Sequence, residues 1–469
     1  MTSTWTLGSL VFVLTWGGGG AALAGLDPSW QAGLNLALDE GIEHGDALVF
    51  SYGPLGFLKS NLLFFPWPAR LAALYGIATH LALSLSLVWA ARRSLPLPVA
   101  VALALVAAAL IRGDAGGIFF KADATVPVLA FIWCVAALDE RRSELARKLV
   151  VYAGAPTAAI EVLGKLNTGV VVLAMLTLTV IAIGPHRRDI LAFFASFLAS
   201  LAALWLAAGQ SAGSAGEYVG GGIEIVSGYV SAMVASGPGR AEDAVLAPAV
   251  VAVAFGIGWV STRGLAHWRR AAILVLLAAL VFSAFKAGFV RHTVFQVAVF
   301  YATVVGACLA FRLPAQPAAR FFGGLAVAGV AAAAWFSTTT SGFLEYPMAD
   351  PIENVSNGFS TVRTLVEPGR AAEEVAESGT RVAAGYGLDP RTLELLRDAP
   401  VHVDPWEAEV AWAHGLEWRP LPVFQTYAAY TEELDRRNAE ALASDDGPSR
   451  ILRQHVAFVG ERYPGSIQD

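Results

Sequence analysis

Acidic and aromatic side chains are concentrated in one segment near the N-terminus, residues 26–57. Asp27 stands where the first apolar run ends, and apolar side chains then recur at helical spacing, at Trp30, Leu34, Leu38 and Ile42. This spacing predicts an amphipathic helix over residues 28–44, lying in the plane of a membrane interface with its acidic residues on the opposite face. A carboxylate there can take a proton from a hydroxyl within hydrogen-bond reach, so Asp27 is the candidate catalytic base.

An aromatic turn, residues 51–57, follows this predicted helix and contains Tyr52, a candidate substrate-binding residue. Two alternatives apply to this segment. Asp followed by Pro is typical of a helix start, with Asp as the N-cap, and the same dipeptide recurs at Asp350, Asp389 and Asp404. Aromatic residues also collect at headgroup depth without any binding role, so the turn is equally typical of an ordinary interfacial bend.

Cationic residues have an uneven distribution that adds to the candidate site. The chain has five lysines, and Lys59, Lys121, Lys165 and Lys286 precede or follow apolar runs on the same predicted side as Asp27. Charges at such positions are costly unless they pair or line a wet cavity. Ammonium and guanidinium groups stabilise a developing phosphate charge. The candidate substrate-binding residues, besides Tyr52, are Lys121, Asp123, Lys165, Lys286, Arg291 and His292. For Lys165, snorkelling from a span end is the structural alternative.

The composition defines the elements that position these residues. The chain has 469 residues, of which 56% are hydrophobic and 15% charged, so we expect a polytopic α-helical membrane protein. The net charge of −6 gives no reason to expect a nucleic-acid partner. Cys134 and Cys308 both lie in apolar runs, which argues against a disulfide framework or a cysteine metal site.

At roughly 20 apolar residues per crossing, the sequence contains about eleven candidate spans. They run near residues 5–25, 68–90, 97–112, 121–138, 149–163, 168–184, 189–208, 244–261, 271–287, 293–311 and 321–338. Basic residues cluster in alternate loops, near residues 92–93, 141–148, 187–188, 263–270 and 312–320. The positive-inside rule then predicts a multi-pass cell-membrane protein with a cytoplasmic N-terminus, the first span being retained rather than cleaved as a signal peptide.

Two regions follow from this topology. Residues 1–338 form the predicted transmembrane domain, with outer loops at residues 26–67, 113–120 and 209–243. The third loop is glycine-rich, and we expect either a second segment against the bilayer or a flexible connector. Residues 339–469 are more polar and form a predicted extracytoplasmic α/β domain. Within it the pattern predicts helices at residues 390–397, 405–415 and 432–442, a strand at residues 401–403 and an extended segment at residues 420–427. In that domain Gln425, Tyr427, Tyr430 and Thr431 suit either a saccharide or a docking surface.

The order of these features resembles the GT-C superfamily of membrane glycosyltransferases. The resemblance rests on Asp27 after the first span, the amphipathic segment behind it, the turn at residues 51–57 and the acids Asp114 and Asp123 of the second loop. It implies hexosyl or pentosyl transfer from a polyprenyl-phosphate-linked donor to a glycan, lipid or protein acceptor of the cell envelope, outside the cytoplasmic membrane. Asp27 is followed by Pro28 where the family pattern has a second acid, so no metal ligand is assigned and a divalent metal stays open.

Two other function classes fit the same residues. In a transporter or lipid-handling protein, the outer charges would form a binding pathway, with charges near the bilayer midplane and broken helices. In a non-catalytic envelope scaffold, the outer domain would bind a partner. Clustering of the charges at one outer mouth favours catalysis at the membrane surface.

Overall fold

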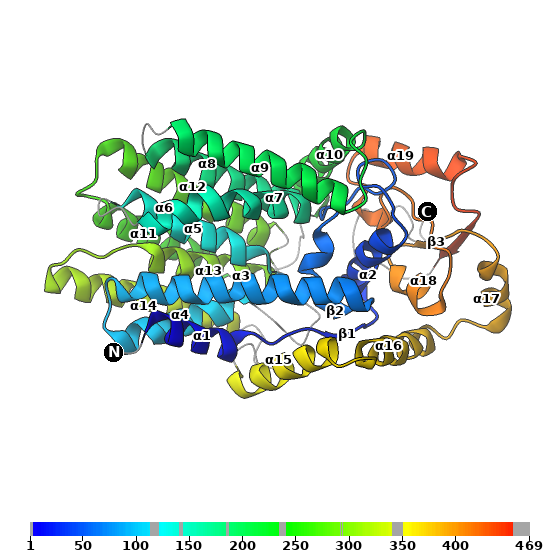
Figure 1. The fold of residues 1–469 in the computed structure, drawn as a ribbon, viewed down its shortest axis with the longest axis horizontal. Helices are drawn as coiled ribbons and strands as arrows, with labels where there is room; N and C mark the ends of the chain where they lie inside the picture. Colours follow the sequence, from blue (N-terminus) through cyan, green and yellow to red (C-terminus); the bar gives the residue numbers. More distant parts are fainter. Residues whose placement is uncertain are drawn as a thin grey trace.

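The computed structural model describes residues 3–112, 122–139, 144–183, 187–233, 241–290, 292, 294–339 and 350–453. A bundle of long, roughly parallel and antiparallel helices forms one part of the molecule, and the C-terminal elements pack at one end of it (Figure 1). The chain is mostly helical, as the sequence predicts.

Six bundle helices are long and apolar enough to cross a membrane. They are α3 (Pro66–Arg92), α8 (Leu166–Ile183), α9 (Arg187–Ala207), α11 (Asp243–Ser261), α12 (His267–Phe289) and α14 (Pro317–Thr339). Shorter apolar helices complete the bundle: α1 (Thr4–Thr15), α4 (Leu97–Arg112), α5 (Thr125–Leu138) and α13 (Val294–Ala310). The predicted span at residues 149–163 corresponds to α6 (Glu144–Lys148), a π-helical turn η3 (Leu149–Ala153) and α7 (Gly154–Gly164). A membrane location follows from these helices, whereas eleven crossings and their sidedness stay predictions.

The main hydrophobic core lies inside this bundle. All residues of α5 from Thr125 to Leu138 are buried, so α5 is its central helix. Side chains of α3, α8, α12 and α13 pack around it. Basic residues in the turns between bundle helices lie at the bundle end away from the C-terminal elements, for example Arg93 after α3 and Arg147 in α6 (Figure 1). This grouping agrees with the predicted common side of the basic loops.

Helix α2 (Leu26–Asp39) lies between the bundle and the C-terminal elements (Figure 1). Every residue from Pro28 to Ala37 is buried, so this helix is covered by protein rather than lying on lipid, and the predicted interfacial helix is wrong in that respect. Gln31 of this helix accepts through Oε1 from the Ser60 hydroxyl and from the Asn61 backbone, whereas its Nε2 is buried without a hydrogen-bond partner in the described part of the chain. Strands β1 (Gly20–Ala21) and β2 (Leu62–Leu63) pair in parallel beside it.

The C-terminal part contains α15 (Pro351–Val366), α16 (Arg370–Tyr386), α17 (Pro390–Arg397), α18 (Ala408–His414) and α19 (Glu432–Ala443). Strands β3 (Val401–Asp404) and β4 (Arg450–Arg453) form a two-stranded parallel ladder. The predicted helices at residues 390–397 and 432–442 and the strand at residues 401–403 are confirmed. Two local predictions are wrong: the helix predicted at residues 405–415 begins at Ala408, and residues 420–427 contain bends and the start of a 3-10 turn, η5 (Thr426–Ala428), rather than an extended segment.

The glycine-rich third loop forms a helix, α10 (Ala215–Met233). Its glycines allow close packing: a Cβ at Gly228 would lie 2.5 Å from the Cβ of Tyr430. Thr431 donates to Glu224 at 2.7 Å, and the rings of Tyr229 and Tyr430 meet edge to face. Tyr430 and Thr431 therefore serve as a docking surface for α10. The opposite face of α10 exposes Val219, Ile223, Val226 and Val230 at helical spacing, as expected for a segment against the bilayer.

Candidate functional site

The aromatic turn after α2 is held against the C-terminal end of α7. Tyr52 pairs with Lys165 as an antiparallel bridge, and the backbone N–H of Leu55 donates to the Leu163 carbonyl at 2.9 Å. Gly53 permits this approach, because a Cβ there would lie 2.6 Å from the same carbonyl oxygen. Residues 52–57 are all buried, so this turn is not a bend exposed at headgroup depth. The pairing brings two segments more than a hundred residues apart into one site.

Four charged side chains meet beside this turn. Lys165 contacts Asp123 at 2.5 Å, and Lys59 contacts Asp123 at 3.4 Å and Glu161 at 2.8 Å. Lys59 comes from η1 (Gly56–Lys59), Asp123 from η2 (Ala122–Ala124), Glu161 from α7, and Lys165 from the junction of α7 and α8. The Lys59 and Glu161 side chains are 2% and 0% exposed, whereas Asp123 and Lys165 are 12% and 16% exposed. The network therefore has a buried half and a half that solvent reaches.

Tyrosine hydroxyls complete this ionic cluster, which we define as Lys59, Asp123, Glu161 and Lys165. Tyr52 donates to Asp123 at 3.1 Å, and its ring faces the Lys165 ammonium at 4.4 Å. Tyr75 donates to Glu161 at 2.5 Å. Buried charges persist only when they are paired and hydrogen-bonded. Each carboxylate of the cluster meets this condition.

The electrostatics of the cluster keep Lys59 and Tyr52 protonated at neutral pH. Burial alone would lower the pKa of Lys59, but the adjacent Glu161 and Asp123 carboxylates outweigh it and raise that pKa. Burial and the Asp123 charge raise the pKa of Tyr52 well above its ordinary value. Lys59 is thus a fixed cation and Tyr52 a fixed hydrogen-bond donor.

Asp27 lies at the edge of this cluster and is joined to it through aromatic rings. Its Oδ1 accepts from the indole Nε1 of Trp30 at 3.0 Å, and the Trp30 ring stacks on Tyr52 at 4.5 Å between centroids. The Asp27 side chain is partly exposed, and within the described part of the chain it makes no ion pair. Asp123 and Glu161, in contrast, are both committed to lysines. Asp27 is therefore the carboxylate of this site with lone pairs open to a ligand.

The alternative that Asp27 is only an N-cap is wrong. The first helical hydrogen bond of α2 runs from Ser29 N to Gly25 O, so Gly25 is the cap and Asp27 lies within the first turn. Gly25 has a φ of 132°, which favours glycine. The cap is completed by Glu409 of α18, which accepts from Gly25 N at 2.9 Å and from Ser29 Oγ. Asp350 and Asp389 do act as N-caps, of α15 and α17.

The remaining predicted site residues are not joined to this cluster by any described contact. His292 instead bonds to Asp243 at 3.1 Å and packs on Phe289. Tyr301 donates to the other Asp243 oxygen at 2.8 Å. Lys286 lies half-buried in the last turn of α12. Lys121 and Arg291 lie outside the described residues.

The site also contains residues that the sequence analysis did not select. Glu161 and Tyr75 are polar groups within apolar segments, a signal that marks functional candidates in membrane proteins. Lys59, like the selected lysines, lies beside an apolar run on the predicted outer side of the membrane. Asp243 is 2% exposed at the start of α11, and its partners could not be inferred from local sequence.

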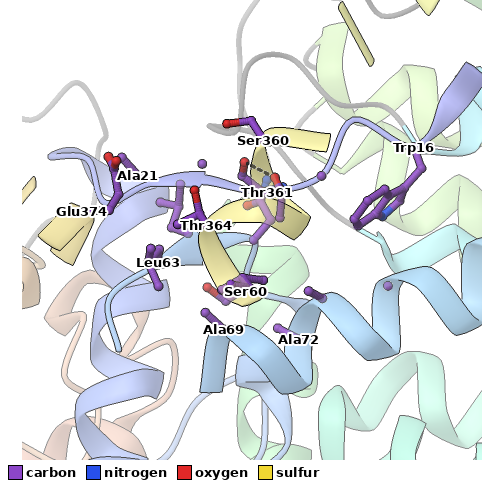
Figure 2. A pocket seen from close by; sticks show the side chains of 18 of the residues that line it. Trp16, Ala21, Ser60, Leu63, Ala69, Ala72, Ser360, Thr361, Thr364 and Glu374 are labelled. Atoms are coloured by element: carbon purple, nitrogen blue, oxygen red, sulfur yellow. Dashed lines mark hydrogen bonds between the residues drawn. The ribbon is translucent and has the colours of Figure 1, made fainter. Parts of the chain in front are cut away.

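A small cavity lies on the other side of the Lys59 segment. It has a volume of about 190 Å³, and its lining includes Ser60, Asn61, Thr361 and backbone of residues 18–21. Figure 2 shows Ser360, Thr361 and Thr364 of α15 above it and Ala69 and Ala72 of α3 below, with Trp16 at one side. Among the described residues the lining has no lysine or arginine and includes the Glu374 carboxylate, so the cavity suits neutral polar groups rather than a phosphate. Both amide atoms of Asn61 are buried without a hydrogen-bond partner in the described part of the chain.

Among the described residues, no group of three or more His, Cys, Asp or Glu side chains is placed to hold a metal ion. No known protein family, curated protein or solved structure matches this chain. The function must therefore be argued from the site itself.

Proposed function

We propose that this protein is a membrane glycosyltransferase that moves a sugar from a polyprenyl-phosphate-linked donor to an acceptor of the cell envelope, on the membrane side where the C-terminal elements pack. The observation that carries the proposal is the partly exposed Asp27 carboxylate at the edge of the ionic cluster, which accepts from the Trp30 indole and makes no ion pair with any described residue. Glycosyl transfer requires a base for the acceptor hydroxyl, and a carboxylate within hydrogen-bond reach can provide it.

The ionic cluster supports the second requirement of the reaction. The leaving lipid phosphate gains negative charge, and fixed cations stabilise that charge where they are already in place. Lys165 is held by Asp123 and by the Tyr52 ring, yet 16% of its side chain is exposed. We assign it to the phosphate, together with Lys121 and Arg291, which the sequence places at the same membrane side. Lys59, which is 2% exposed, anchors the cluster.

The surrounding structure supports the third requirement, a site at the membrane surface. Helix α2 is enclosed between the bundle and α18, and α10 exposes an apolar stripe nearby. A lipid-linked donor would keep its chain in the bilayer and bring its phosphate to the level of α2. Clustering of the charges at one end of the bundle favours this arrangement over a transport pathway through the midplane.

The experiment that tests the proposal is transfer from radiolabelled polyprenyl-phosphate sugars by purified protein in lipid. Asp27→Asn keeps an oxygen for the Trp30 indole but removes the base, so we expect transfer to fall by about 10²- to 10⁴-fold without loss of fold. Asp39→Asn is the matched control, because Asp39 ends the same helix and is exposed. Equal turnover in the Asp27 and Asp39 variants would remove Asp27 from the mechanism.

A deletion strain tests the reaction class separately from the residue. Loss of a transferase should make its lipid-linked sugar donor accumulate. A transporter would instead move a lipid or sugar between membrane sides without changing its covalent structure. Absence of both donor accumulation and transfer by the wild-type protein would refute the proposal.

A further inference from the structure

The bundle end away from the C-terminal elements contains a second, larger cavity. Its volume is about 810 Å³, and it lies among the end of α3, the end of α5, the turn between α11 and α12, and the turn between α13 and α14 (Figure 1). Its ionisable lining residues are Arg93, Asp139, Arg263, Arg312 and Arg320. Four guanidinium groups thus surround one carboxylate.

Only one of these arginines is neutralised within the described part of the chain. Arg93 forms an ion pair with Asp139. Arg263, Arg312 and Arg320 make no ion pair with any described residue. Outside the cavity at this end, Arg147 pairs with Glu144 and Asp189, whereas Arg269 and Arg270 lie over the rings of Trp268 and Trp259 and make no ion pair with a described residue. Three guanidinium groups that have no ion pair in the described part of the chain thus belong to one cavity lining.

Basic residues are expected at one side of any multi-pass protein, but exposed snorkelling side chains would explain them there. Arg93 departs from that explanation, since its side chain is only 16% exposed. Among the described residues, its Nη1 is buried without a hydrogen-bond partner, as is the hydroxyl of Ser261 in the same lining. A buried donor without an acceptor is costly, so these atoms are placed for an acceptor that enters the cavity.

The electrostatics of Arg93 agree with this. Burial lowers the pKa of Arg93, the Asp139 carboxylate partly offsets that effect, and the nearby Arg312 charge lowers the pKa further. An anion between Arg93 and Arg312 would relieve both the burial and the mutual repulsion. Guanidinium groups are suited to such an anion because their planar donors match two oxygens of a phosphate or carboxylate at once.

We propose that this cavity binds a phosphate group, either that of an anionic lipid headgroup at this membrane face or that of a soluble phosphate compound. Several guanidinium groups in one lining fit the multiple oxygens of a phosphate better than the two of a carboxylate. A position at the end of the helical bundle is also the level at which lipid headgroups lie. The site is at the opposite end of the bundle from Asp27, so it does not depend on the glycosyltransferase proposal.

The test is thermal unfolding of the full-length protein in two arms. In the lipid arm, nanodiscs of phosphatidylglycerol are compared with nanodiscs of phosphatidylcholine. In the soluble arm, inorganic phosphate replaces chloride at constant ionic strength in neutral detergent. A ligand that binds only the folded state raises the unfolding temperature. Arg312→Gln and Arg320→Gln remove cavity charges without leaving Asp139 unpaired, and Arg269→Gln removes one charge from the same end outside the cavity.

We expect a saturable rise in unfolding temperature with phosphatidylglycerol or with inorganic phosphate, and the arm that gives it identifies the source. The apparent affinity should fall by about tenfold in Arg312→Gln and Arg320→Gln, as for loss of one charge-assisted bond, and stay unchanged in Arg269→Gln. Equal shifts in cavity and control variants would overturn the proposal. So would shifts that chloride or phosphatidylcholine reproduces.

Discussion

The indole ring of Trp30 lies flat on the ring of Tyr52, with 4.5 Å between centroids and 7° between planes. The same indole donates to Asp27, while the Tyr52 hydroxyl donates to Asp123. Two stacked rings therefore connect the carboxylate at the start of α2 with the ionic cluster. Because both rings are buried, a shift of one is transmitted to the other.

Trp30→Phe tests this connection. The variant keeps an aromatic ring on Tyr52 but removes the donor to Asp27, so we expect a stability loss of only about 1 kcal/mol. Transfer activity should fall by about tenfold or more, because the base loses the bond that orients it. Trp5→Phe, at a residue that is 71% exposed, serves as the control. Activity and unfolding temperature are measured on the same preparations, and unchanged transfer by the Trp30 variant would contradict the orienting role.

The Lys59–Glu161 pair should show strong energetic coupling. Lys59→Met leaves a fully buried carboxylate without its cation, and we expect a loss of about 3–5 kcal/mol. Adding Glu161→Leu removes the stranded charge. The stability loss of the double variant should therefore be smaller than the sum of the two single losses, by about 0.5–3 kcal/mol. Unfolding temperatures of the four proteins of this cycle provide the measurement.

The exposed pair Arg363–Glu367 is the matched comparison for that cycle, because both side chains are more than 40% exposed. Its coupling should be about 0–1 kcal/mol. Strictly additive effects at Lys59 and Glu161 would show that burial does not strengthen their interaction.

Part of the site was predictable from the sequence. Asp123, Lys165 and Tyr52 were selected as charged or aromatic residues beside apolar spans, and the structure brings them into contact. Each carried a local signal, a polar group where the membrane context makes it costly. The N-caps at Asp350 and Asp389 were likewise predictable from the Asp-Pro dipeptide alone.

The rest depended on contacts between distant segments. The apolar stripe of α2 correctly indicates a buried face, but nothing in that segment shows that α18 and Phe424 cover the other face. The same holds for Lys59, whose partners lie 64 and 102 residues away. Hydrophobic periodicity reports one face of one element, whereas partner choice is set by tertiary packing.

Glu409 should control the order of the first turn of α2. It accepts from Gly25 N, Ser29 Oγ and the Tyr386 hydroxyl, so Glu409→Ala leaves three donors without their acceptor. We expect a stability loss of about 1–3 kcal/mol. Amide hydrogen exchange should accelerate at residues 25–30, because the helix start loses its cap. Glu440→Ala, which removes an exposed surface carboxylate, is the control. Unchanged exchange at Gly25 would contradict this capping role.

Glu407 should make the stability of the C-terminal part depend on pH. Its side chain is 2% exposed, and burial, with smaller contributions from the Glu409 and Asp404 charges, raises its pKa from 4.5 to about 7. A carboxyl whose pKa is higher in the folded state holds its proton more tightly there. Its stabilising contribution is therefore complete below pH 4.5 and is lost as the pH rises through about 7.

Glu407→Gln mimics the protonated form at every pH and isolates this effect from other titrating groups. The comparison is needed because His402 titrates in the same region. Burial lowers the pKa of His402 to about 4, so its effect on the slope of stability against pH has the opposite sign. We expect the variant and the wild-type protein to unfold at similar temperatures at acidic pH, and the variant to be more stable by up to about 3 kcal/mol above neutrality. The measurement is the difference in unfolding temperature between the two proteins across the pH series. A constant difference would mean that Glu407 is ionised in the folded protein throughout, with its burial cost met by the Trp406 N–H and its own backbone.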